Sequence, residues 1–68
     1  MKKIFEGAKF GEMYKTEGRL RLVYIRYEVK HQRHMLVSPL GRYVFCDHDG
    51  RVVYDGESQY NVIEKENM

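Results

Sequence analysis

The sequence predicts an all-β domain, built as a small single-domain barrel or a strongly curled antiparallel sheet of five to six short strands. Three observations lead to this fold class. Tyr, Val, Ile and Phe, which favour strands, are frequent. The glycines fall between short apolar runs, where turns are expected. No long window shows the spacing of three and four residues that marks a helix. With 68 residues, the chain holds one domain, 1–68, whose ordered core we expect at about 9–64.

The first two strands are expected at residues 12–16 and 19–29. Alternation in the first run is weak and centres on Met13 and Tyr14. The second run is apolar on both faces, with Leu20, Leu22 and Tyr24 on one and Val23, Ile25 and Tyr27 on the other. Such a strand lies inside a sandwich or barrel, or changes face at a bulge near residues 23–25.

Turn signals divide the second half of the chain into further strands. Pro39-Leu40-Gly41 suits a short hairpin loop, and Asp49-Gly50 is the strongest hairpin signal in the sequence. Asp55-Gly56 marks another turn. The strands between these turns are expected at 34–38, 42–47, 51–55 and 59–64. At the C-terminus, where Ser58 could also cap a short helix, the β-branched pair Val62-Ile63 favours a strand.

The composition predicts a cytoplasmic protein without a membrane partner. Cys46 is the single cysteine, so an internal disulfide is excluded and a reducing compartment is the simpler assumption. Glu6 and Lys9 interrupt the start of the chain, which therefore fails as a signal peptide. Charge is uneven: residues 1–34 carry nine Lys or Arg against four Glu, and residues 35–68 carry three against six acidic residues.

Two segments carry a resemblance. The stretch KFGEMYKTEGRLRLVYI, with Gly11, Tyr14, Thr16, Gly18 and Arg19, looks like the first hairpin of SH3-like small β-barrels. Together with DGRVVYDGESQYNVI it also resembles short uncharacterised β-domains of bacteria and their phages. The likeness spans about residues 9–64. It implies an SH3-like fold and carries no activity to this chain.

Metal chemistry has one candidate set of ligands, His31 and His34 followed by Cys46 and His48. Structural zinc takes four ligands, typically from two closely spaced pairs. Two histidines three residues apart point to opposite faces of a continuous strand, so only a bend between them would bring the set together. We therefore expect three surface histidines, a buried thiol and no metal or cofactor.

Neither calcium binding nor catalysis finds a suitable pattern. In a calcium loop with Gly50 at the glycine position, Phe45 would stand at the first ligand position, so Asp47 and Asp49 are expected to bond turn backbone instead. Cys46 and His48 could form a nucleophile and base, but the tight turn after His48 and the small core leave little room for a substrate pocket. We expect no enzyme and no small-molecule substrate.

The basic stretch at residues 15–33 supplies the candidate binding residues, with tyrosine among the cations. Basic side chains beside aromatic rings are what small barrels use to bind single-stranded nucleic acid. The charges form one patch only if the strand twists or bulges, and they could equally solvate an exposed edge. The candidate residues are Arg19, Arg21, Arg26, Tyr27, Lys30 and Arg33.

Protein binding is the other class of function. Six Tyr and three Phe exceed what a tiny core needs, and Tyr with Arg is enriched at interface hot spots. The oppositely charged halves of the sequence suit self-association. The sequence therefore predicts a non-enzymatic binding or adaptor module acting through a protein partner or a homo-oligomer, with a nucleic-acid-binding barrel as the alternative. The core is expected to contain Phe10, Tyr14, Leu20, Leu22, Ile25, Leu36, Val44, Cys46, Val53, Tyr60 and Val62.

Overall fold

The computed structural model describes residues 3–53 and 58–66 and confirms the all-β class. A five-stranded antiparallel sheet has the order β4-β3-β2-β1-β5. One turn of 3₁₀ helix, η1, precedes the last strand. The elements are β1 (Met13–Thr16), β2 (Arg21–Glu28), β3 (Arg33–Val37), β4 (Tyr43–Cys46), η1 (Ser58–Tyr60) and β5 (Val62–Lys65).

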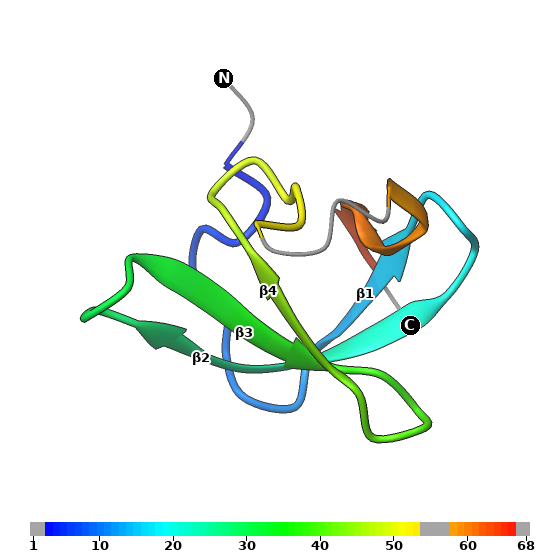
Figure 1. The fold of residues 1–68 in the computed structure, drawn as a ribbon, viewed down its shortest axis with the longest axis horizontal. Coiled ribbons are helices and arrows are strands. Elements are labelled where there is room, and N and C mark those ends of the chain that lie inside the picture. Colours follow the sequence, from blue (N-terminus) through cyan, green and yellow to red (C-terminus); the bar gives the residue numbers. More distant parts are fainter. Residues whose placement is uncertain (1–2, 54–57, 67–68) are drawn as a thin grey trace.

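Strands β1 to β4 follow one another as successive hairpins, and β5 returns to pair with β1. Figure 1 shows these strands fanned by a strong twist, with the N-terminal segment and the loop after β4 at the same end of the sheet. The domain is compact, with a Cα radius of gyration of 10.5 Å. The twist gives the sheet a concave face that holds the core and a convex outer face.

A bulge in β2 explains why that strand is apolar on both faces. Tyr24 pairs with Leu36, but the next paired residue is Arg26, opposite Met35. Ile25 is therefore the extra residue, and the alternation shifts by one after it. As a result Tyr27 lies on the same concave face as Tyr24, instead of the face it would share with Val23 in a regular strand. The bulge expected near residues 23–25 is confirmed.

The core lies on the concave face, and the sequence correctly predicts six of its members. Tyr14, Leu22, Leu36, Val44, Cys46 and Val62 are buried as expected. Phe10 is 77% exposed and Val53 is 44% exposed, so both were wrongly assigned. Leu20, Ile25 and Tyr60 are half-buried. The missed members are Phe5 and Tyr24.

Phe5 reaches the core because residues 3–8 form turns that cover the open end of the concave face. Its ring lies 5.0 Å from that of Tyr14, 5.6 Å from that of Tyr24 and 4.4 Å from that of His34, measured between centroids. Ile4 and Ala8 pack beside it. Phe10 follows this segment, in the turn before β1, and its side chain lies outside the core.

The loop after β4 turns at Gly50, as the Asp49-Gly50 pair predicts. Gly50 has a φ of 90°, and the Asp47 carboxylate accepts hydrogen bonds from the backbone N–H groups of Asp49 and Arg51. This confirms the role expected of Asp47. In the described part of the strand expected at 51–55, residues 51–53, a single bridge joins Cys46 and Val52; the rest of that strand and the Asp55-Gly56 turn lie outside the described residues.

The C-terminal segment combines both alternatives considered for it, a helical turn at Ser58–Tyr60 and then a strand. Among the residues that the structure describes, no helix is long and apolar enough to cross a membrane.

Candidate functional site

The structure divides the predicted binding residues among three places. Arg19 and Arg21 lie at the β1–β2 turn, and both are exposed. Arg21 forms an ion pair with Glu66 at 3.1 Å. Lys15, opposite Arg21 on β1, lies 3.8 Å from Glu64. This end of the sheet thus gathers three cations, two of which have acidic neighbours on or after β5.

Arg26 and Arg33 meet at the other end of β2, around one carboxylate. Glu28 accepts a hydrogen bond from Nε of Arg33 and lies 3.5 Å from a guanidinium nitrogen of Arg26. The hydrogen bond from Arg33 lowers the pKa of Glu28 below its usual value. The Arg33 guanidinium also stacks on Phe45, 3.9 Å from the ring centroid. Lys30 is exposed in the β2–β3 turn.

Tyr27 lies on the opposite face of β2 from these arginines, against two histidines. Its ring is stacked on that of His48, with centroids 5.5 Å apart and planes inclined by 17°. His34 is buried, contrary to the expectation that all three histidines lie on the surface, because the β2 bulge and Phe5 enclose it. His31 is exposed in the turn.

A chain of hydrogen bonds leads from the core to the surface through these rings. Tyr24 Oη lies 2.7 Å from Nδ1 of His34, and Nε2 of His34 lies 2.9 Å from Nδ1 of His48. With neutral rings and the proton of His34 on Nε2, the Tyr24 hydroxyl donates to Nδ1 of His34, and Nε2–H of His34 donates to Nδ1 of His48. Burial, followed by the proximity of His48, lowers the pKa of His34 to about 4.

The candidate metal ligands come together only in part. Cys46 pairs with His34 across β3 and β4, and His34 contacts His48, but His31 lies apart in the exposed turn. Within residues 3–53 and 58–66, no three His, Cys, Asp or Glu side chains are grouped for a metal ion. Burial raises the pKa of the Cys46 thiol to about 12, which leaves it protonated and unreactive.

Sequence reasoning did not single out the convex side of β3 and β4. Residues at alternate positions of these strands face outward and pair across the sheet, Met35 with Phe45 and Val37 with Tyr43. Of these residues, Tyr43 is 60% exposed. We call these four residues, with Arg26, Glu28 and Arg33 beside them, the outer face. In the sequence, this face is indicated by the apolar residues at odd positions of β3 and β4, because a strand with one solvated face would carry polar residues there.

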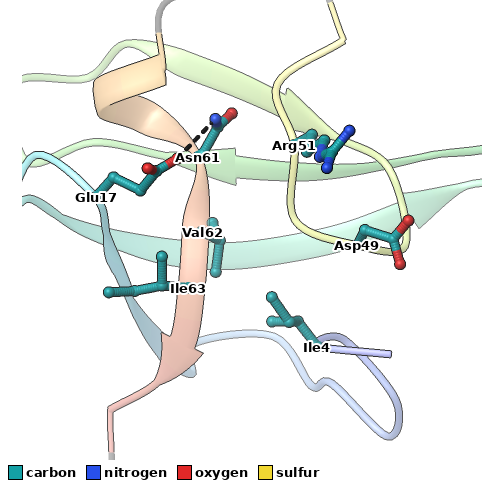
Figure 2. A pocket seen from close by; sticks show the side chains of 7 residues that line it. All are labelled: Ile4, Glu17, Asp49, Arg51, Asn61, Val62 and Ile63. Carbon is teal, nitrogen blue, oxygen red and sulfur yellow. Dashed lines mark hydrogen bonds between the residues drawn. The ribbon is translucent and has the colours of Figure 1, made fainter. Parts of the chain in front are cut away.

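A separate pocket of about 250 Å³ lies where β5 meets the Gly50 loop. Figure 2 shows Ile4, Val62 and Ile63 as its apolar part, with Asp49 and Arg51 on the loop side. Glu17 accepts a hydrogen bond from Asn61 on its other side. The apolar side chains and the mixed charges leave no grouping of donors or acceptors that selects one ligand.

Comparisons with protein-family models, with curated proteins and with solved structures each give no match.

Proposed function

We propose that this protein is a small binding module that self-associates through the outer face. The observation that carries this proposal is the composition of that face. Tyr43, which is 60% exposed, and the half-buried Met35, Val37 and Phe45 lie together on the outward side of two paired strands. Tyrosine, methionine and arginine are enriched in interface cores relative to other surface. The Arg33 guanidinium stacks on Phe45 beside this surface, with its side chain 13% exposed.

The charges beside this surface favour a second copy of the chain as the partner. Arg26, Glu28 and Arg33 place both signs of charge at one end of the outer face. A two-fold interface requires a surface that is complementary to itself. Both signs of charge on one surface are compatible with such an interface. Stacking two antiparallel sheets in this way would form a sandwich about 10 Å thick.

The size of the outer face sets the expected strength of association. Three strands spaced about 4.8 Å apart and five residues long give a flat area of roughly 240 Å². Specific interfaces usually bury about 800 Å² on each partner. We therefore expect a weak dimer, with a dissociation constant in the micromolar range or higher.

We also propose that the domain is an SH3-like barrel and that the protein is cytoplasmic. A run of four hairpin-connected strands, a last strand that returns to the first, and a helical turn before it support the barrel interpretation. The nucleic-acid alternative is less well supported, because Arg26 and Arg33 share Glu28 and Tyr27 lies on the opposite face. A continuous surface of cations and rings along residues 15–33 is therefore absent from the described chain.

Sedimentation equilibrium tests the proposal on the wild-type chain and two variants. The wild type is expected to shift from monomer toward dimer between about 10 μM and about 1 mM. Tyr43→Asp places a charge at the most exposed apolar residue of the outer face and should keep the chain monomeric throughout. Phe10→Asp is the matched control, since Phe10 is an exposed aromatic residue outside β2, β3 and β4. A wild type that stays monomeric, or equal effects of both variants, would refute self-association through this face.

A further inference from the structure

A second concavity, of about 280 Å³, lies at the β1–β2 turn, apart from the residues that define the outer face. It is lined by Lys15, Thr16, Arg19, Arg21 and Ile63. A bulge creates it: Lys15 pairs with Glu64 and Thr16 pairs with Val62, so Ile63 has no partner on β1. Bulges commonly occur next to functional sites, where they redirect side chains.

Three cationic side chains line this pocket, and two of them have carboxylate neighbours, Glu64 and Glu66. Lys15 and Arg21 come from neighbouring strands and Arg19 from the turn between them. Glu17, an acidic residue in the same turn, is not part of this lining, and its carboxylate accepts a hydrogen bond of 2.8 Å from Asn61 (Figure 2). Of the three cations, Lys15 has a long ion pair of 3.8 Å and Arg21 has one of 3.1 Å. Arg19 makes no ion pair or hydrogen bond through its side chain within the described residues.

Arg19 also has an unfavourable backbone conformation. Its φ is 63°, in the left-handed region that glycine and asparagine adopt more readily. The turn uses this conformation, since the N–H of Arg19 donates to the carbonyl of Thr16. An arginine at this position lowers the stability of the fold and places a cation at the pocket. Strained residues of this kind cluster at ligand sites.

We propose that this pocket binds a phosphate group, presented as a phosphate monoester. Two guanidinium groups and an ammonium group match a dianion with several acceptor oxygens, and arginine forms paired hydrogen bonds to phosphate. The Thr16 oxygen accepts the N–H of Leu20, and its hydroxyl hydrogen remains a donor. Ile63, 43% exposed, provides an apolar wall for the organic part of the ester.

An NMR titration of the ¹⁵N-labelled chain with phenyl phosphate tests this site, with inorganic phosphate in parallel. The amide shifts should move at residues 15–21 and at Ile63. Arg19→Gly is expected to weaken binding at least about tenfold while removing the strain. Glu66→Gln, which removes the anion paired with Arg21, should tighten it. Arg26→Gln is the matched control, a β2 arginine outside the pocket, and should leave the affinity unchanged.

Three results would overturn the proposal. One is the absence of shifts at the pocket, and another is equal weakening by Arg19→Gly and Arg26→Gln. The third is tighter binding of a single-stranded oligonucleotide through the same residues, which would make the ligand a nucleic-acid backbone. The titration repeated on Tyr43→Asp separates this proposal from the self-association proposal, because the phosphate affinity should be the same in that variant.

Discussion

Acidification should destabilise this fold through one residue, His34, before the carboxylates titrate. His34 is 5% exposed and is held between the Tyr24 hydroxyl and the His48 ring. When both imidazole rings are neutral, the hydroxyl hydrogen of Tyr24 and the Nε2 hydrogen of His34 each have an acceptor in this chain of hydrogen bonds. Protonation of His34 at Nδ1 would turn that nitrogen from an acceptor into a donor, and the Tyr24 hydroxyl hydrogen would lose it as an acceptor. The folded state therefore resists protonation of His34.

The size of the effect follows from the pKa of His34, which is about 4 in the folded chain against 6.5 for an ordinary histidine. The unfolded chain binds the proton more readily, so stability is fully present above the ordinary value and is lost as the pH falls from there toward 4. Between about pH 7.5 and about pH 5, the linkage relation gives a loss of about 2 kcal/mol from this group.

Urea unfolding at a series of pH values measures this loss. His34→Gln keeps a polar side chain and removes the titrating group, so its free energy of unfolding should vary by about 2 kcal/mol less than that of the wild type over this range. His31→Gln removes an exposed histidine three residues away and should leave the wild-type pH dependence in place.

If His34→Gln fails to fold, NMR titration of the imidazole signals in the wild type provides the same test. A pKa of His34 near its ordinary value, or a His34→Gln variant with the wild-type pH dependence, would show that His34 does not cause the loss of stability on acidification.

Three further predictions concern glycine, arginine and cysteine. Gly50→Ala should destabilise the fold by about 2–4 kcal/mol in urea unfolding, because a Cβ there would lie 2.3 Å from the carbonyl oxygen of Val62. Gly41 has a φ of 88° and open space around it, so Gly41→Ala should destabilise the fold by only about 1 kcal/mol. Equal losses in the two variants would contradict the role of the contact between residue 50 and Val62. Arg19→Gly should raise the thermal midpoint by a few degrees, equivalent to about 1 kcal/mol, and a fall would show that φ at this position is not strained. The Cys46 thiol should react with iodoacetamide about a thousandfold more slowly in the folded chain than in the unfolded chain, and rapid native labelling would contradict its burial.

The strands were predictable because their signals are local. Alternation and turn residues place β1 to β4 within two residues of their predicted bounds. The face change in β2 was expected from a strand that is apolar on both sides, and the bulge at Ile25 accounts for it. The turn at Gly50 was expected from the Asp-Gly pair.

What the sequence could not supply depends on contacts between distant segments. Phe5 and Phe10 both precede β1, and only the path of residues 3–8 over the concave face decides that Phe5 is buried. His34 looks like a polar strand residue until the β2 bulge aligns Tyr27 and Tyr24 beside it.

The candidate site was predicted only in fragments. The basic stretch supplied the right residue types, but their grouping depends on where Glu28, Glu64 and Glu66 fall in space. Arg19 was singled out for its charge, and its φ could not be foreseen, since arginine is uncommon in that conformation. The outer face required the pairing of β3 with β4.

The most direct test of self-association is an isotope-filtered NOE experiment on a mixture of ¹³C-labelled and unlabelled chains at high concentration. Self-association through the outer face predicts contacts between the methyl groups of Met35 or Val37 of one copy and the Tyr43 ring of the other. Intermolecular contacts confined to residues outside the outer face, or none at all in a concentrated sample, would contradict it.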